Sequence, residues 1–393
     1  MTQNLSIPDT ETGRDPETLK LLLESVRRLV DDVLIPAEAA VDAAARVPDE
    51  IVDALRRMGL FGISVPEIHG GLGLNMNEET QILFELCRAS PSYRALLGTT
   101  VGVGGKSIVL DGTDAQRAAY LPRIATGEMI VSFCLTEPDS GSDAAGLKTS
   151  ARRDGGDYVI NGTKRFISNA PDAGLFCVMA RTDPEQKRAS GVSAFLVEAG
   201  TPGLSVGPPP RKMGQKGGHV ADVIFEDCRV PANALLGGLE GRGFRTAMKV
   251  LDDGRLHMSA VAVGLATRLI EESVRYARDR RQFGQPIGDF QLIQGMLADS
   301  EAECYAARAM TERTARLRDR GATITKEAAS CKYFATEAAW RIADRAVQIH
   351  GGYGYMSDTA VERLFRDARL LRIYEGTSQI MQLVIAREML KEA

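Results

Sequence analysis

The chain has 393 residues, of which 44% are hydrophobic, and this is enough material for two or three domains with their own cores. Its 48 basic and 52 acidic residues give a net charge of −4, so we expect no nucleic acid among its partners. The first twenty residues are polar and no long apolar run follows them, which predicts a cytoplasmic protein without a membrane segment.

Cysteine and histidine usage predicts neither disulfides nor a metal site. The six cysteines are scattered and form no CxxC pair, so in a chain without a secretion signal they indicate buried thiols. The four histidines are equally isolated and cannot assemble an obvious metal site.

The first third of the chain is predicted to be helical. Residues 1–15 are polar and aperiodic, which predicts a flexible tail. Apolar residues then recur at helical spacing within 19–37, 48–59 and 76–89. We therefore expect an N-terminal helical domain over 16–129.

Residues 130–237 have a different texture, because they hold half of the sixteen prolines and several short runs rich in β-branched and aromatic residues. These runs predict the strands of a middle β-sheet domain over 130–237. Asn161-Gly162 lies between the runs DYVI and KRFIS, and it predicts a hairpin because a type I′ turn needs two positive φ angles.

Long helical periods return in residues 238–393, where a single proline interrupts the pattern. One helix is predicted to end at Gly351-Gly352, and another is predicted to begin at Thr377 or Ser378. The predicted fold is therefore α+β, mainly α, with an N-terminal helical domain, a middle β-sheet domain and a C-terminal four-helix-bundle domain.

The segment FCLTEPDSGSDAAGLKT places hydroxyl groups and bare backbone at the end of a predicted strand. Thr136, Ser140, Gly141 and Ser142 suit hydrogen bonding to a flat heterocycle or to a phosphate. A polar turn capped by Asp143 explains the same residues, and spacing alone does not separate the two interpretations.

The segment KRFISN combines an aromatic ring with a hydroxyl group. Strand alternation puts Phe166 and Ser168 on one face, where they could support a ring system and hydrogen-bond its edge. An ordinary core strand is the simpler interpretation of this segment taken alone.

The segment RYARDRRQFGQPIGDFQ concentrates four arginines just before a Phe-Gly-Gln-Pro break. Such a run is usually a solvated helix face. The functional interpretation is a pyrophosphate clamp, because guanidinium groups bind phosphate through two parallel hydrogen bonds.

A single carboxylate, Glu375, lies in RIYEGTSQIMQ between an apolar stretch and a predicted helix start. It is either an ordinary loop carboxylate near a helix N-terminus or a base that faces something apolar. The second interpretation has a chemical rationale, because burial in an apolar pocket makes a carboxylate a stronger base.

Taken in order, the segments TEPDSGSD, KRFISN, DDGR, RRQFG, QIHGGYG and IYEGTSQ resemble the acyl-CoA dehydrogenase family of flavoproteins, from about residue 16 to residue 393. The resemblance implies FAD as cofactor, an acyl-CoA thioester as substrate and an electron-transfer flavoprotein as electron acceptor. It also implies a homodimer or homotetramer and a role in the β-oxidation of fatty acids.

The resemblance also implies which residues contact FAD. Thr136 matches a hydroxyl at the carbonyl edge of the flavin, and Ser168 matches a residue near the ring nitrogen that receives hydride. Arg280 and Gln348 belong to segments that reach the FAD of a neighbouring subunit. The full implied set is Phe133, Leu135, Thr136, Gly141, Ser142, Phe166, Ile167, Ser168, Arg280, Gln282, Phe283, Gln291, Gln348, Gly351, Gly352, Thr377 and Gln379.

Glu375 matches the family's catalytic base, which removes an α-proton while a β-hydride passes to the flavin. The backbone N–H of this glutamate is implied to hydrogen-bond the thioester oxygen. Some relatives carry their base at the position of Gly254, so here Glu375 has no competitor. The residues implied to bind substrate are Ser142, Asp252, Arg255, Tyr374 and Gly376.

Two questions remain open from the sequence. Asp139-Ser140 is more polar than the pair usual in the family, and the small residues Gly98, Thr99 and Thr100 predict depth at the pocket floor. Other members of the same superfamily offer alternatives, namely an acyl-CoA oxidase, a flavin monooxygenase or an acyl-CoA-binding scaffold without catalysis.

Overall fold

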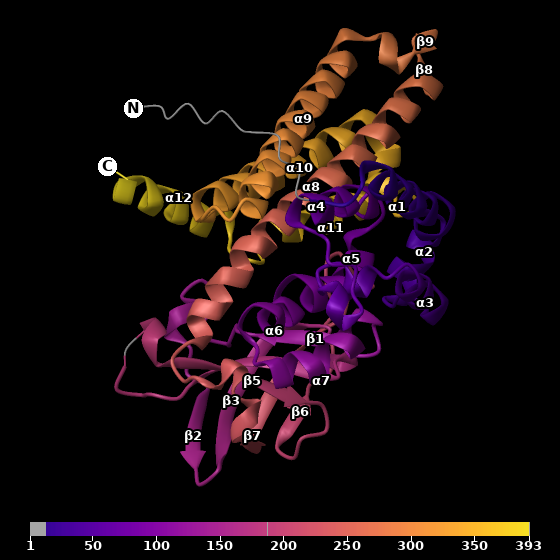
Figure 1. The fold of residues 1–393 in the computed structure, drawn as a ribbon. Coiled ribbons are helices and arrows are strands. Elements are labelled where there is room, and N and C mark those ends of the chain that lie inside the picture. The colour runs from indigo at the N-terminus through magenta and orange to yellow at the C-terminus, as the bar shows by residue number, and fades with distance from the viewer. Residues whose placement is uncertain (1–12, 187, 393) are drawn as a thin grey trace.

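The computed structural model describes residues 13–186 and 188–392, so the predicted tail lies outside the described residues up to residue 12. Helices form one layer and a mixed sheet forms another, with the sheet at the bottom of Figure 1. The order along the chain is helices, strands and helices again, which confirms the predicted fold class. The domain boundaries at 129/130 and 237/238 stay a prediction.

The N-terminal helices begin at polar caps. Asn75 and Thr113 each form a capping box with Glu78 and Gln116, so both helix starts satisfy their first N–H groups. The helix through Pro36 is continuous, because a π-helical turn, Val30–Leu34, joins its two halves. The helices of this part are α1 Pro16–Leu29, α2 Ile35–Ala44, α3 Asp49–Arg57, α4 Met76–Leu86, α5 Pro91–Gly98, α6 Gly105–Asp111 and α7 Asp114–Ala125.

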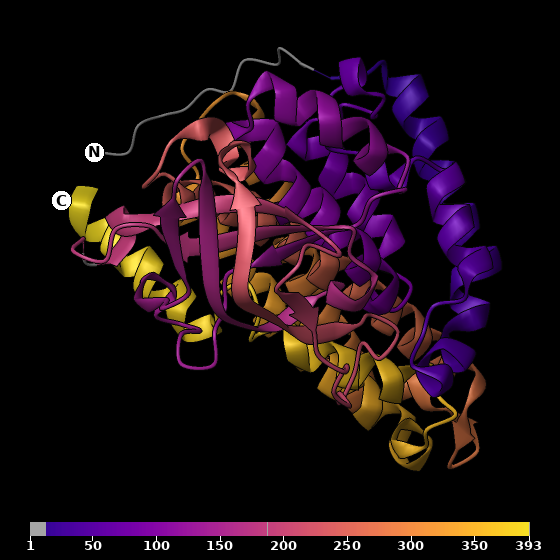
Figure 2. The same cartoon turned by 90° about the horizontal axis from the view of Figure 1, so that it is seen from below.

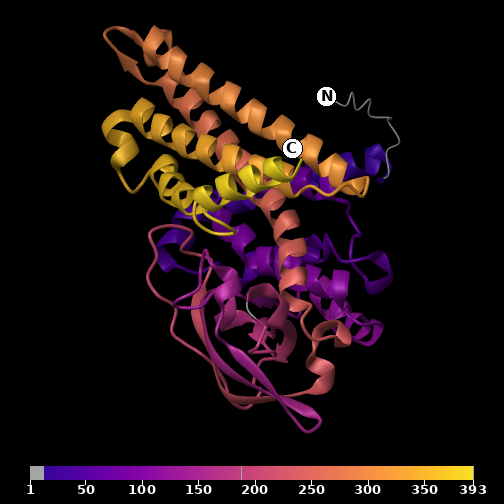
Figure 3. The same ribbon diagram turned by 90° about the vertical axis from the view of Figure 1, so that its left-hand side faces the viewer.

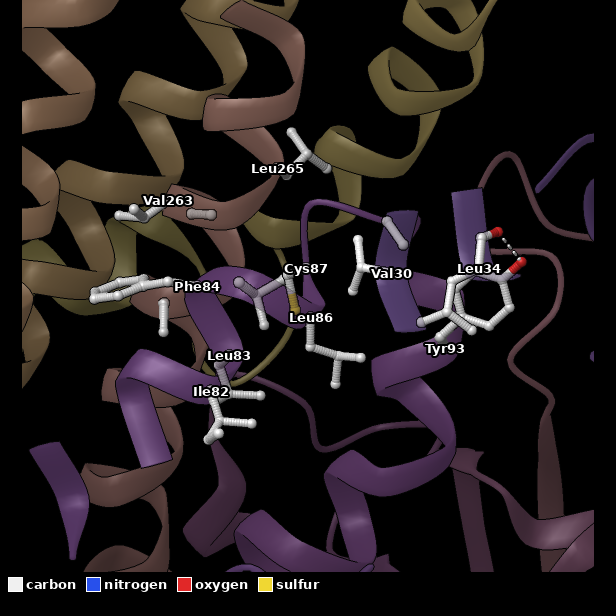
Figure 4. Close-up of a cluster of buried hydrophobic side chains, with 14 of the residues drawn as sticks. Val30, Leu34, Ile82, Leu83, Phe84, Leu86, Cys87, Tyr93, Val263 and Leu265 are labelled. Atoms are coloured by element: carbon white, nitrogen blue, oxygen red, sulfur yellow. Dashed lines mark hydrogen bonds between the residues drawn. The ribbon is translucent and has the colours of Figure 1, made fainter. Parts of the chain in front are cut away.

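The core of the helical layer joins both ends of the chain. Figure 4 shows Phe84 and Cys87 of the α4 region facing Val263 and Leu265 of the long helix α8, Gly243–Asp279. Gly264 permits this close approach, because a Cβ there would lie 2.8 Å from the Cβ of Cys87. The N-terminal helices are therefore packed directly on the C-terminal bundle.

The sheet holds seven strands of the described residues, in the order β1-β4-β2-β3-β7-β6, with β5 paired to β4. Strands β4 and β5 are buried along almost their whole length, which explains their continuous apolar sequences. The strands are β1 Val131–Cys134, β2 Ser150–Asp154, β3 Asp157–Ser168, β4 Leu175–Arg181, β5 Val192–Glu198, β6 Leu204–Val206 and β7 Val220–Pro231.

The hairpin predicted at Asn161-Gly162 is wrong, because β3 runs straight through these residues. The turn that reverses the chain is at 155–156, between β2 and β3. Asn161 lies instead at a register shift against β7, where its side chain hydrogen-bonds the backbone N–H of Asp227 at 2.8 Å. The local turn propensity of Asn-Gly is thus used for a bulge in a long strand.

The C-terminal helices stand on the sheet and extend away from it. α8 has 37 residues and is therefore about 55 Å long. It begins beside the sheet and ends at the small hairpin β8–β9, far from the sheet in Figures 1 and 3. The other elements are β8 Arg281–Gln282, β9 Gln285–Pro286, α9 Gln291–Asp319, α10 Thr325–His350, α11 Ala360–Leu371 and α12 Ser378–Glu392.

The last helix, α12, packs against α10 in the C-terminal bundle, and the view from below shows it beside and behind the strands of the sheet (Figure 2). The predicted end of one helix and the predicted start of another are confirmed, since α10 ends at His350 and α12 begins at Ser378. Thr377 caps α12, because its Oγ1 accepts a hydrogen bond from the N–H of Ile380 at 3.2 Å. The loop before α12 is thereby fixed above the sheet.

The predictions on cysteines agree with the structure, in which all six thiols are free and buried. Within the described part of the chain, no group of three metal-binding side chains is found. No helix among the described residues combines the length and apolarity that crossing a bilayer requires.

Candidate active site

A cavity of about 1730 Å³ opens between the sheet, α5, α8 and the loop before α12. This cavity brings together residues that are more than 200 positions apart in the chain, from the FCLTEPDSGSD segment to Glu375. The predicted site residues that line it are Phe133, Leu135, Thr136, Gly141, Ser142, Phe166, Ile167, Ser168, Arg255, Tyr374, Glu375, Gly376 and Thr377.

The carboxylate of Glu375 lies at the wall of this cavity. Its backbone is left-handed, with φ of 52°, and Gly376 follows with φ of 94°, so a tight turn precedes α12. The side chain is 16% exposed, and its Oε2 is buried without a hydrogen-bond partner among the described residues. A buried carboxylate oxygen without a partner is costly, which points to a ligand or substrate group facing it.

Gly254 on α8 faces the same carboxylate. A Cβ at this position would collide with Oε2 of Glu375 and would lie 3.5 Å from Cγ1 of Val103. The space that the glutamate occupies therefore depends on the absence of a side chain at position 254.

Two cations lie beside Glu375, and neither was predicted from the sequence. Nη1 of Arg94 is 3.9 Å from Oε1 of Glu375, and Nζ of Lys332 donates to the carbonyl of Gly376 at 2.6 Å. Burial lowers the pKa of Lys332 to about 8, although the Glu375 carboxylate opposes that shift. The cavity is therefore not purely apolar, because the buried side chains of Arg94 and Arg255 line it and Lys332 holds the loop that carries Glu375.

A signal for both cations exists in the sequence. Arg94 interrupts the otherwise uncharged helix segment PSYRALLG, and Lys332 interrupts SCKYFA, on a helix face where alanine and cysteine are buried. A charged residue on an apolar helix face is either paired or functional. The partner could not be named, because it is distant in the chain.

The loop after β1 is held by a buried ion pair. Nζ of Lys164 on β3 is 2.7 Å from Oε1 of Glu137, and the Glu137 carboxylate also accepts the N–H groups of Lys148 and Thr149. Burial alone would raise the pKa of Glu137, but the Lys164 ammonium and the N–H donors hold it below its ordinary value. The hydroxyl groups of Thr136 and Ser142 are thereby presented at the cavity wall.

The aromatic ring of Phe166 offers a large uncovered face to the cavity. Its side chain is 62% exposed, its φ is 57°, and the Arg165 guanidinium lies 5.3 Å from the ring centroid. Opposite this strand, Gly141 has no atom within 4 Å of the place its Cβ would take. An exposed ring, neighbouring hydroxyl groups and open backbone suit a flat, polar-edged ring system such as a flavin.

The unusual pair Asp139-Ser140 turns away from the cavity, which explains why its polarity is tolerated. The Asp139 carboxylate is exposed and lies 3.3 Å from Nζ of Lys148. Ser140 is buried, and its Oγ donates to the carbonyl of Asp143 at 2.5 Å. Neither residue lines the cavity.

Asp252 does not line the cavity, but it supports a residue that does. Nη1 of Arg255 donates to Oδ1 of Asp252 at 2.5 Å, and Thr325 donates to the other oxygen at 2.7 Å. Burial raises the pKa of Asp252 above its ordinary value. Arg255 keeps a buried Nε without a partner among the described residues, so its guanidinium remains available to a ligand.

The remaining predicted cofactor residues do not reach this cavity within one chain. Arg280 comes directly after the last residue of α8 and 25 positions after Arg255, which corresponds to about 37 Å along the helix. Gln379 lies on the exposed face of α12. The residues gathered at the hairpin end are exposed, namely Arg280, Gln282, Phe283, Gln291, Gln348, Gly351 and Gly352.

The pocket floor differs from the expectation at Gly98 to Thr100. Gly98 and Thr99 line the cavity, but the space beside Gly98 is filled by the Arg94 guanidinium. Thr100 is buried and does not line the cavity, because its Oγ1 accepts the N–H of Val131 at 3.1 Å.

Comparison with known proteins gives one consistent result. Three family models match the chain: "Acyl-CoA dehydrogenase, N-terminal domain" over residues 16–128, "middle domain" over 132–228 and "C-terminal domain" over 241–390. The acryloyl-CoA reductase (NADH) of Anaerotignum propionicum is 42% identical, over 98% of this chain and 96% of that protein.

Another relative and a solved structure cover similar lengths. Subunit CarC of the caffeyl-CoA reductase-Etf complex of Acetobacterium woodii is 40% identical, over 90% of this chain and 92% of that protein. The structure of butyryl-CoA dehydrogenase from Megasphaera elsdenii superposes with a TM-score of 0.92 at 33% identity. It covers 96% of this chain and 99% of that one.

Proposed function

The chain belongs to the acyl-CoA dehydrogenase family of FAD-dependent oxidoreductases, and from this premise we propose that it converts an acyl-CoA thioester to the trans-2-enoyl-CoA. The observation that carries this proposal is the buried Oε2 of Glu375, which has no hydrogen-bond partner among the described residues and belongs to a side chain that lines the same cavity as the exposed ring of Phe166. A proton acceptor and a place for a ring system therefore share one space.

In the proposed reaction, Glu375 removes the proton from the α-carbon of the thioester. Its Oε2 is not engaged by any described residue, so it can approach the substrate without first breaking a hydrogen bond. The backbone N–H of Glu375 donates to no other described residue, and it is free to hydrogen-bond the thioester oxygen as negative charge develops there.

Bound FAD supplies the two-electron acceptor that takes the β-hydride. The residues that would hold it in this chain are those around the cavity, where Phe166 offers its ring and Thr136, Ser142 and Ser168 offer hydroxyl groups. The Glu137–Lys164 pair keeps the loop that carries Thr136 and Ser142 in place.

We propose that each site is completed by a second copy of the chain. The exposed hairpin end carries guanidinium and amide groups but lies about 37 Å along α8 from the cavity wall at Arg255. In a two-fold dimer this end of one copy can reach the cavity of the other, and a dimer of such dimers is the proposed tetramer.

A mixture of two inactive variants is expected to recover activity if the site is shared. Glu375→Gln removes the base, and Arg280→Glu places a negative charge where FAD phosphates are expected, so each homodimer should fail. A mixed dimer has one site with both wild-type residues, and random assembly would restore about a quarter of the sites. Activity and bound flavin are measured after co-expression. No recovery above the separate variants would show that Glu375 and Arg280 do not complement each other across subunits.

We propose an electron-transfer flavoprotein as the acceptor, since the relative CarC is named as a subunit of a caffeyl-CoA reductase-Etf complex. The relatives named as reductases favour a second candidate function, the reduction of a 2-enoyl-CoA by the same site. The chemistry is reversible, so the geometry serves both directions. An acyl-CoA oxidase or monooxygenase activity is tested by the rate at which the reduced flavin reoxidises in air.

The holoprotein is expected to bleach when an acyl-CoA is added without oxygen, because the flavin is reduced as the enoyl product forms. The measurement is the loss of oxidised-flavin absorbance with a panel of short, medium, branched and aryl-substituted thioesters. Product identity by mass spectrometry, two hydrogens lighter than the substrate, provides the control. A yellow protein that no thioester of the panel bleaches would contradict the proposed activity.

A further inference from the structure

Arg94 places a buried guanidinium in the wall of the proposed acyl site. The residue is 6% exposed and lines the cavity from α5. The chain makes room for it with a glycine one helical turn away, because a Cβ at Gly98 would lie 2.5 Å from its Nη1. The position of the guanidinium in the cavity wall therefore depends on the absence of a side chain at position 98.

One nitrogen of this guanidinium lacks a hydrogen-bond partner among the described residues. Nη2 is buried and has no partner among the described residues. Nη1 is 3.9 Å from Oε1 of Glu375, which is within range for an ion pair but too long for a hydrogen bond. A buried cation with unfilled donors is unfavourable until an anion arrives.

Among the described residues, Glu375 is the only carboxylate that forms an ion pair with this guanidinium. Glu375 loses its negative charge when it accepts the α-proton. Arg94 would therefore be left without any close counter-charge at the moment of proton transfer, unless the substrate brings one.

We propose that Arg94 binds a carboxylate carried by the acyl chain, so that the preferred substrate is the CoA thioester of a short dicarboxylic acid. This rests on the proposed function, because it assigns the substrate class of the same site. Guanidinium and carboxylate match each other through two parallel hydrogen bonds. The acid is short because the base and the guanidinium are 3.9 Å apart, which leaves room for only a few carbons between the α-carbon and the anion.

The test compares succinyl-, glutaryl- and adipoyl-CoA, each against the thioester whose terminal carboxylate is replaced by an amide. With the wild-type holoprotein, at least one carboxylate substrate is expected to exceed its amide in kcat/KM by roughly 10- to 100-fold, the size of a charged hydrogen bond. Arg94→Gln is expected to erase this ratio, and Arg94→Lys is expected to keep part of it.

A binding measurement separates this proposal from the reaction itself. CoA thioethers of the same chains lack the carbonyl and cannot be dehydrogenated, and calorimetry gives their Kd with each variant. If the carboxylate thioether binds more tightly than the amide and Arg94→Gln abolishes the difference, the subsite stands even where no thioester bleaches the flavin. The proposal is overturned if the wild-type protein binds the carboxylate and amide thioethers with equal Kd. It is also overturned if the protein turns over the carboxylate and amide thioesters with equal kcat/KM.

A structural role for Arg94 predicts a different result. If Arg94 only holds Glu375 in place, Arg94→Gln lowers turnover of amide and carboxylate substrates by the same factor, and this outcome overturns the proposal. Gly98→Ala is a second variant that keeps the charge but displaces the guanidinium, because the added Cβ meets Nη1. It is expected to reduce the carboxylate preference as well. Flavin content and the thermal unfolding temperature show that each variant is folded.

Discussion

Glu375→Gln is expected to keep FAD and to lose dehydrogenation by roughly 10²–10⁴-fold or more, because a single essential acid–base group contributes that much. Glutamine has nearly the same shape but cannot take a proton from carbon at neutral pH. Because Oε2 of Glu375 has no partner among the described residues, the substitution breaks no hydrogen bond of the folded protein at this oxygen. The measurement is the rate of anaerobic flavin bleaching per bound flavin.

Glu337→Gln is the matched control for this variant. Glu337 is a partly buried carboxylate near the same loop, where it accepts hydrogen bonds from Arg372 at 2.7 Å and Ser378 at 2.5 Å. It does not line the cavity, so its loss is expected to lower the bleaching rate far less than the loss of Glu375. Wild-type rates for Glu375→Gln with any good substrate would show that the base is another group.

Gly254→Ala is expected to lower kcat by about 10²-fold, because a displacement of the catalytic group by about 1 Å has an effect of that size. The added Cβ collides with Oε2 of Glu375, so the carboxylate must rotate away from the position that it takes in the structure. The same change replaces glycine by alanine within α8, which favours the helix by up to about 1 kcal/mol. The variant should therefore lose activity without losing stability.

Gly295→Ala is the control for Gly254→Ala, which is expected to lose activity without losing stability. Gly295 lies within α9, and a Cβ there would have no atom within 4 Å. This variant gains the same helix preference but touches nothing near the cavity, so its bleaching rate is expected to equal the wild-type rate. If Gly254→Ala also bleached at that rate, the position of Glu375 in the structure would not be the catalytic one.

Periodicity and caps were sufficient to predict the fold. The helices and strands follow from apolar spacing, and the end of α10 at His350 and the start of α12 at Ser378 follow from local glycine and hydroxyl residues. The failure at Asn161-Gly162 has a physical cause, since pairing of β3 with β7 over twelve residues outweighs the preference of two residues for a turn.

The residues of the candidate site were predictable from the sequence only where they belong to a recognised motif. Glu375 and the cavity strand were reached through ordered sequence motifs. Arg94 and Lys332 were not, because their roles depend on contacts with residues 281 and 44 positions away. A sequence shows that a charge sits on an apolar helix face, but only the packed chain shows which group it meets.

The long reach of α8 has a consequence for assembly. The FAD contacts proposed at the cavity and at the hairpin are separated by about 37 Å along the helix, so under this proposal one chain alone would offer only part of the FAD site. Under the proposed sharing of sites, each bound FAD contacts both chains and stabilises their association. FAD binding and subunit association would then be linked equilibria. Dilution would release FAD as the chains dissociate, and added FAD would favour their association.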